Sequence, residues 1–247
     1  QYDVIHCNTP MGGIVTRLAA KKSRKLGTKV YYTAHGFHFY KGAPKKNWIV
    51  FYPIEKLFSR ITDKIITITA EDYRLAQQKF HCHIERIHGV GVDEKRYFPV
   101  NEDEKQELRT RMGFDKEQKL ILCTGELLLN KNQTMAIKMM KNVIKQYPTS
   151  QLLLAGNGPQ KEQLEQVVTE YGLNKCVQFL GYVTNLQEYQ HIVDIAVSCS
   201  KREGLPLNIV EAMLSGTPVV ATMNRGHREL IKDGENGCLV PIDDSAN

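Results

Sequence analysis

Short apolar runs alternate with amphipathic helical patterns along the whole chain of 247 residues. This alternation predicts an α/β protein in which helices wrap parallel sheets. Strands are expected in the first part at Asp3–Cys7, Lys29–Thr33, Lys64–Thr67 and Ile84–Ile87. In the second part they are expected at Leu120–Thr124, Gln151–Ala155, Val177–Leu180, Ile195–Ser198, Pro218–Ala221 and Gly237–Val240. The helical stretches between them include Val15–Leu26, Trp48–Ser59, Gln133–Gln146 and Pro159–Tyr171.

A polar segment, residues 101–117, contains no apolar strand and is expected to form a surface helix between two domains. We expect a first domain at 1–98, an interdomain segment at 99–117 and a second domain at 118–247. Charge changes at the same place, because residues 1–98 carry a balance of +9 and the remainder carries −3. The net charge therefore changes at the same boundary as the pattern of strands and helices.

The positive charge of the first domain is concentrated in two clusters. They consist of Lys21, Lys22, Arg24 and Lys25, and of Lys41, Lys45 and Lys46. Such clusters occur on solvated helix faces and on surfaces that contact anionic lipid headgroups. Both interpretations stay open. Nucleic acid is not expected as a partner, because no nucleic-acid-binding motif accompanies the charge.

The six cysteines form no C-x-x-C pair, and most of them lie in apolar, strand-like runs. They are typical of small buried side chains in a reducing compartment rather than of a disulfide framework. No apolar run approaches the roughly 20 residues of a membrane span, and no signal peptide is visible. We expect a cytoplasmic protein, with attachment to the inner face of the membrane as the alternative that the lysine clusters leave open.

Two glutamates in the stretch S-K-R-E-G-L-P-L-N-I-V-E-A-M are the strongest candidates for a site. Pro206 is tolerated in the first turn of a helix and poorly inside one, so a helix is expected to begin near it. Glu203 then lies in the preceding loop, and Glu211 lies one turn inside the helix. The N–H groups of Gly204 and Leu205 are free at the helix N-terminus, where donors and the helix dipole favour a phosphate. Carboxylates beside a phosphate site suit the hydroxyl groups of a ribose or a hexose.

The same stretch, followed by S-G-T-P-V-V-A-T, closely resembles the retaining glycosyltransferases of family 4. The resemblance extends from D-V-I-H-C-N-T-P-M-G-G to G-C-L-V-P, and is strongest over residues 181–241. The resemblance implies the GT-B fold, in which two Rossmann-like domains face each other across a cleft. The members that it resembles most build bacterial capsule and exopolysaccharide.

The resemblance implies roles for the two glutamates and for one lysine. Glu211 would hold the ribose hydroxyls, Glu203 would face the donor sugar, and the amides of Gly204 and Leu205 would contact the phosphates. Lys131, in G-E-L-L-L-N-K-N-Q, matches the loop in which basic residues hold the diphosphate.

Three further residues match the nucleotide side of the resembled site. Gly156 and Gly158, in L-L-L-A-G-N-G-P, match a loop near the nucleotide, although a simple turn explains them equally well. The backbone around Val183 would meet the edge of the base. Glu126 departs from many members, which have arginine at that position, and a carboxylate cannot pair with phosphate.

His35 is the candidate from the first domain. It follows a strand in V-Y-Y-T-A-H-G, where open parallel sheets bind their ligands, and the matching family position is a histidine near the donor sugar. No metal is expected. His81, His83 and His88 lack partners at metal-ligand spacing, and no D-x-D motif stands at a strand end.

The expected function is transfer of a sugar from a nucleotide donor, a UDP-sugar, to a lipid-linked saccharide with retention of configuration. No separate cofactor is implied. Two alternatives remain open, a UDP-sugar 2-epimerase of the same architecture and a non-catalytic nucleotide-sugar-binding subunit. The resemblance also implies an incomplete first domain, because the leading strands of the family have no match here, and further helices after the last strand.

Overall fold

The computed structural model describes residues 2–242, which divide into two compact units at Val90 and Gly91. This division lies eight residues before the expected boundary at 98. Unit 1 contains β1 (Val4–Asn8), α1 (Pro10–Ala19), α2 (Lys21–Lys25), β2 (Lys29–Ala34), α3 (Lys45–Ser59), β3 (Lys64–Thr67), α4 (Ala70–Lys79) and β4 (His83–Arg86).

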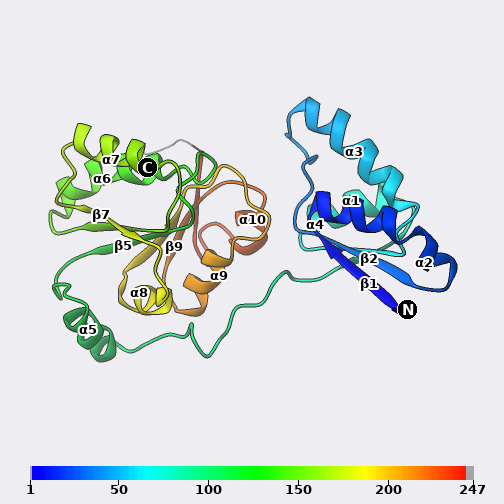
Figure 1. Ribbon diagram of the computed structural model, residues 1–247. Coiled ribbons are helices and arrows are strands. Elements are labelled where there is room, and N and C mark those ends of the chain that lie inside the picture. Colours follow the sequence, from blue (N-terminus) through cyan, green and yellow to red (C-terminus); the bar gives the residue numbers. More distant parts are fainter. Residues whose placement is uncertain (1, 243–247) are drawn as a thin grey trace. The chain divides into compact units, whose positions relative to one another are not determined.

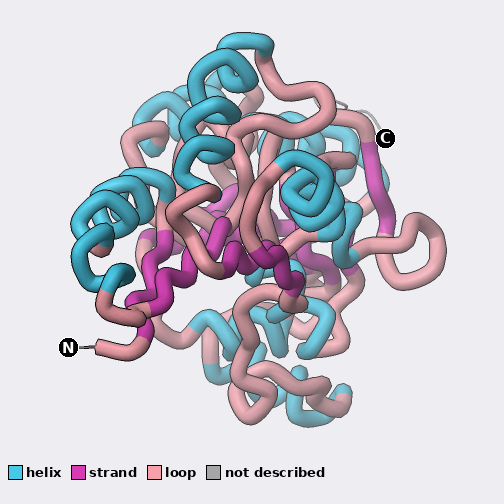
Figure 2. Tube along the Cα trace, turned by 90° about the vertical axis from the view of Figure 1, so that its right-hand side faces the viewer, coloured by secondary structure: helices cyan, strands magenta, loops and turns pink. Residues whose placement is uncertain are grey.

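Unit 2 begins with α5 (Glu102–Arg111), β5 (Leu120–Thr124), α6 (Gln133–Gln146), β6 (Gln151–Ala155), α7 (Lys161–Glu170) and β7 (Val177–Gly181). It continues with α8 (Leu186–Ile192), β8 (Ile195–Ser198), α9 (Leu207–Leu214), β9 (Val219–Thr222), α10 (His227–Leu230) and β10 (Cys238–Val240). Figure 2 draws the chain as a tube, with its helices in cyan and its strands in magenta.

The described strands of unit 1 form a four-stranded parallel sheet in the order β1-β2-β3-β4. Each crossover advances by one strand in the same direction, so right-handed connections place the helices on one face, as Figure 1 shows for α1 and α3. Phe37 and Phe39 stack at 4.9 Å in the core beneath them. A buried ion pair joins α1 to α3, with Arg17 Nη1 2.9 Å from Glu55 Oε2.

The described strands of unit 2 form a six-stranded parallel sheet in the order β10-β9-β8-β5-β6-β7. Its central strands are buried on both faces, since alternate residues of β5 pack against different helices. Ile121 and Cys123 belong to the cluster with α6 and α7, whereas Leu120 and Leu122 face α8. Figure 1 shows α6 and α7 on one side of this sheet and α8 on the other.

The helix that we expected in a segment between the domains, α5, packs in unit 2. Asn101 and Glu104 form a capping box at its first turn. Arg109 is 2 % exposed, donates from Nε to the Ile192 carbonyl at 2.8 Å, and pairs through Nη2 with Asp194 at 2.9 Å. These contacts hold α5 against α8 and the start of β8.

Candidate functional site

The carboxyl ends of the unit 2 strands bring most of the predicted site residues to one edge of the sheet. The chain passes outward from β5 to β6 and β7, and then returns to the other side of β5 with β8, β9 and β10. In open α/β sheets, ligands bind outside the carboxyl ends of the strands where the order reverses in this way. Here the reversal lies between β5 and β8, so the loops that follow these two strands form the candidate site.

The loops after β5 and β8 meet through the side chains of Lys131 and Glu203. Lys131 Nζ lies 2.7 Å from Glu203 Oε1, and the two side chains are 25 % and 13 % exposed. Lys131 also lies over Gly125, where an added Cβ would be 3.4 Å from the lysine Cε. Two residues predicted separately from the sequence are thus in direct contact.

Gly156 and Gly158 follow β6, and at both positions the neighbouring backbone leaves no room for a side chain. Gly156 has a φ of +141°, and a Cβ there would lie 2.1 Å from the carbonyl oxygen of Gly125. A Cβ on Gly158 would lie 2.4 Å from the carbonyl oxygen of Leu127. The absence of side chains therefore permits the loops after β5 and β6 to pack together.

A cavity of about 300 Å³ opens beside these loops, at the ends of β5, β6 and β7. Val183, predicted to lie near the base, lines it, and so does Glu126, to which the sequence assigned no role. Its lining consists of Thr124, Gly125, Glu126, Ala155, Gly156, Asn157, Tyr182, Val183 and Leu186. A cavity with backbone groups, an amide side chain and a tyrosine can hold a planar heterocycle.

The helix that carries Glu211, α9, begins at Leu207 with Pro206 as its N-cap, as the sequence predicted. Asn208 Nδ2 donates to the Thr124 carbonyl at 3.3 Å and so holds the helix against the end of β5. In the part of the chain that the structure describes, the N–H groups of Gly204 and Leu205 have no protein acceptor. They are available to an anion.

Glu211 is half-buried, and this burial raises the pKa of its carboxyl group. A hydrogen bond with the hydroxyl of Tyr97 and the positive charge of Arg96 act in the opposite direction. The carboxylate is thus partly desolvated and has a neighbouring donor. Sequence reasoning missed Tyr97, because a long polar segment separates this residue from the first strand of the sheet. No local pattern connects Tyr97 to α9.

His35 lies in unit 1, immediately after β2, and its side chain is exposed. Its Nε2 is 3.1 Å from Oδ1 of Asn8, the last residue of the adjacent strand β1. The predicted position at the carboxyl end of a parallel strand is therefore the observed one.

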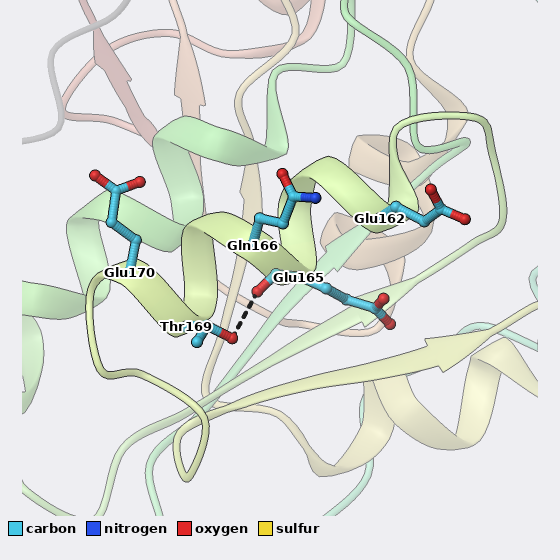
Figure 3. Close-up of a pocket in the computed structure, with 5 residues that line it drawn as sticks. All are labelled: Glu162, Glu165, Gln166, Thr169 and Glu170. Carbon is cyan, nitrogen blue, oxygen red and sulfur yellow. Dashed lines mark hydrogen bonds between the residues drawn. The ribbon is translucent and has the colours of Figure 1, made fainter.

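A second hollow, of about 680 Å³, lies on the outward face of α7. Figure 3 shows its five lining residues along a single helix, with Glu162 and Glu170 at opposite ends. All five are exposed and none belongs to the predicted site. We interpret this surface as a solvated acidic helix face.

Residues 2–242 contain no group of three or more His, Cys, Asp or Glu side chains that could hold a metal ion. Within the same range, no helix combines the length and apolar character needed to cross a membrane. All six cysteines are free, and three of them are buried.

Two family models match successive parts of the chain. The model described as "Glycosyl transferases group 1" matches residues 104–247. The model described as "Glycosyltransferase Family 4" matches residues 1–96.

Two curated relatives cover nearly the whole chain. EpsD of Bacillus subtilis (strain 168), a protein named as a glycosyltransferase, is 44% identical over 248 residues, which are 100% of this chain and 65% of EpsD. The UDP-Gal:alpha-D-GlcNAc-diphosphoundecaprenol alpha-1,3-galactosyltransferase of Escherichia coli is 26% identical over 99% of this chain and 64% of its own length. The chain thus spans slightly less than two thirds of these relatives.

Among solved structures, Anabaena Alr3699/HepE in complex with UDP and glucose superposes with a TM-score of 0.83 at 24% identity. The match covers 99% of this chain and 65% of that protein. This likeness confirms the predicted GT-B fold class, of which the chain covers a part.

Proposed function

Because the chain belongs to the family of group 1 glycosyl transferases, we propose that it binds a UDP-sugar at the carboxyl edge of the six-stranded sheet. We propose further that the whole protein transfers the sugar, with retained configuration, to a lipid-linked saccharide. The type of product would be a capsular polysaccharide or exopolysaccharide.

The contact between Lys131 and Glu203 carries this proposal. An ammonium group has three N–H donors, so the bond to Glu203 leaves two for the oxygens of a diphosphate. Glu203 accepts hydrogen bonds only, which suits sugar hydroxyl groups. In a nucleotide sugar, the β-phosphate and the sugar ring are joined through one oxygen atom. A phosphate-binding cation 2.7 Å from a hydroxyl-binding carboxylate matches that covalent arrangement.

Other groups at the same edge fit the rest of a nucleoside diphosphate. The N–H groups of Gly204 and Leu205 would bind phosphate oxygens. Glu211 would accept from the ribose hydroxyls, and the cavity beside Val183 and Gly156 would hold the uracil ring. His35 remains the candidate from unit 1 for a contact with the donor sugar.

In the proposed reaction, the bond between the anomeric carbon and the β-phosphate oxygen breaks as a bond to the acceptor oxygen forms on the same face. The proton of the acceptor hydroxyl passes to the departing phosphate. Lys131 and the amides of Gly204 and Leu205 stabilise the charge that develops on the diphosphate. The proposed mechanism does not require a metal ion.

The lipid-linked acceptor is supported by the Escherichia coli relative, whose name contains a diphosphoundecaprenol-linked sugar. We also propose that unit 1 contacts an anionic membrane surface from the cytoplasmic side. The solvent-facing stripe of α3 is apolar, with Ile49 72 % exposed, Val50 50 % and Leu57 60 %. Lys45 and Lys46 precede this stripe and Arg60 follows it, and all three are exposed. Basic residues that flank an exposed apolar helix face are typical of interfacial membrane binding.

The deciding experiment is calorimetric titration of the protein with UDP, uridine and a panel of UDP-sugars. Binding of UDP that is much tighter than binding of uridine is expected from the phosphate contacts. Release of UDP that depends on an added acceptor would support a transferase. Conversion of UDP-N-acetylglucosamine without any acceptor would favour the epimerase, and binding without turnover by the full-length protein would favour the non-catalytic subunit.

A further inference from the structure

The segment that connects β8 to α9, residues 199–206, carries Glu203, and we name it the Glu203 loop. On one side it is held by Asn130, which precedes Lys131. The N–H of Lys201 donates to the Asn130 carbonyl at 2.8 Å, and Asn130 Nδ2 donates to the Arg202 carbonyl at 2.9 Å. The loops of Lys131 and Glu203 are therefore joined through backbone as well as side chains.

On the other side the Glu203 loop is held by residues at the end of β9 and just after it. The hydroxyl of Thr222 donates to the Ser200 carbonyl at 2.6 Å, and Asn224 Nδ2 donates to the same oxygen at 2.8 Å. All three residues are at least 90 % buried. The Ser200 carbonyl thus accepts two hydrogen bonds, both from the short segment 222–224.

The imidazole of His227 holds this segment in place. It is 0 % exposed, with Nδ1 2.5 Å from the Thr222 carbonyl and Nε2 3.0 Å from the Ser198 hydroxyl. A carbonyl can only accept, so Nδ1 carries the proton and Nε2 of the neutral ring accepts from Ser198. The His227 N–H also donates to Asn224 Oδ1 at 3.0 Å. One side chain therefore connects the end of β8 with the end of β9.

Gly226, the residue before His227, packs directly against Glu203. A Cβ added to Gly226 would lie 2.7 Å from Glu203 Cβ and 2.7 Å from the Gly204 carbonyl oxygen. Displacement of the segment 224–227 would therefore displace Glu203 and Gly204.

We propose that His227 is a positioning residue for the donor sugar, because its ring fixes the segment 222–227 that supports the Glu203 loop beside Lys131. The inference rests on the proposed function and adds a residue that the motifs at the sheet edge did not indicate. An apolar side chain of similar size would fill the space, but would leave the Thr222 carbonyl and the Ser198 hydroxyl without these partners.

The test first selects, from UDP-glucose, UDP-galactose and UDP-N-acetylglucosamine, the UDP-sugar that most raises the melting temperature of the wild-type protein. It then measures the ratio of the dissociation constant of that UDP-sugar to the dissociation constant of UDP. His227→Ala should raise the constant of the UDP-sugar relative to that of UDP by about tenfold, the change expected when a hydrogen bond to a charged group is lost. Thr222→Val keeps the side-chain shape and removes one donor to Ser200, so it should change the ratio in the same direction by a smaller factor. His227→Asn keeps a donor near the Thr222 carbonyl and should restore part of the ratio. Exposed His81, replaced by alanine, is the control.

A double-mutant cycle separates positioning from general stability. In a Glu203→Ala background, His227→Ala should have no further effect on the ratio, because the group that it positions is gone. A melting temperature that falls while the ratio stays at the wild-type value, in both His227→Ala and Thr222→Val, would overturn the inference. Absence of UDP binding by the wild-type protein would count instead against the proposed function.

Discussion

Lys131 Nζ lies 2.7 Å from Glu203 Oε1, although 72 positions separate the two residues in the sequence. The contact exists because β5 and β8 are neighbours in the sheet while β6 and β7 extend away on the other side of β5. The cation that we propose for phosphate and the carboxylate that we propose for sugar hydroxyls thus come together where the order of the described strands reverses.

Replacement of Lys131 by alanine should weaken UDP binding much more than uridine binding. Within the bound nucleotide, the ammonium group would contact only the diphosphate, so its removal leaves the nucleoside contacts unchanged. The difference should shrink as salt concentration rises, because salt screens charge pairs that are partly exposed. Calorimetric titration with UDP and with uridine measures this difference in affinity. Lys138→Ala, at an exposed position of α6, should behave as the wild type. Equal losses for UDP and uridine in Lys131→Ala would show that the lysine acts through the fold.

The two glutamates should differ in their effects on nucleotide affinity. Glu211→Ala should cost roughly 1.5–3 kcal/mol of UDP binding, as expected for a hydrogen bond to a charged group. Glu203→Ala should change UDP affinity little and reduce the use of the UDP-sugar. Titrations with UDP and with the UDP-sugar distinguish the two roles, and Glu162→Ala on the exposed face of α7 is the control. The assignment of roles would fail if both variants lost UDP affinity equally.

The fold could be predicted from the chain largely because the strands are short apolar runs bounded by turn residues. The start of α1 was predicted less accurately, at Val15 instead of the observed Pro10. Gly13 lies inside this helix, where the Tyr32 ring packs against it. An added Cβ at Gly13 would lie 2.8 Å from Tyr32 Cε2. The glycine reflects a tertiary contact that a local pattern does not contain.

The same reason limits what could be predicted of the site. Residues on strand-end loops, such as Lys131 and Glu203, were indicated by motifs and by their position after apolar runs. Asn130 and His227 were not, because their importance depends on β5, β8 and β9 being neighbours. Strand order is a property of the assembled sheet, and a local apolar run carries no information about it.

Gly156→Ala should destabilise unit 2 strongly. The φ of +141° is unfavourable for alanine, and the new Cβ would lie 2.1 Å from the carbonyl oxygen of Gly125. Backbone strain of this kind costs on the order of 1–3 kcal/mol, and the steric overlap adds to it. Thermal unfolding followed by circular dichroism measures the change. Gly172→Ala is a matched control, because its φ is also positive, at +67°, but no atom lies within 4 Å of the added Cβ. Equal effects of the two substitutions would contradict the argument from close approach.

Asp194 should make the stability of unit 2 depend on pH in the acid range. Burial alone would raise the pKa of its carboxyl group, but hydrogen bonds from Lys105, the Leu120 N–H and Arg109 outweigh burial and lower it below the ordinary value of 3.8. A carboxyl group with a lowered pKa stabilises the folded state above its unfolded pKa, and this contribution is lost as pH falls through the folded value. Unfolding midpoints measured from pH 6 downward should therefore fall less steeply in Asp194→Asn than in the wild type. Asp194→Ala should cost roughly 3–5 kcal/mol at neutral pH, because it leaves the buried Arg109 without its charged partner. Identical pH profiles in Asp194→Asn and the wild type would show that other groups dominate the acid transition.

The apolar stripe of α3 should determine binding of the protein to anionic vesicles. Ile49→Glu or Leu57→Glu places a negative charge on an exposed face that is now apolar, so it should reduce both insertion and electrostatic attraction. Cosedimentation with vesicles of phosphatidylcholine and phosphatidylglycerol measures the bound fraction, and added salt should lower it, because electrostatic attraction is screened beyond about 10 Å at 0.1 M. Vesicles of phosphatidylcholine alone test the need for anionic lipid. The control is Leu129→Glu, which changes a leucine of similar exposure, 72 %, in unit 2. Vesicle binding that is lost equally in the α3 variants and in Leu129→Glu, or that is the same with and without phosphatidylglycerol, would refute α3 as the membrane-contacting surface.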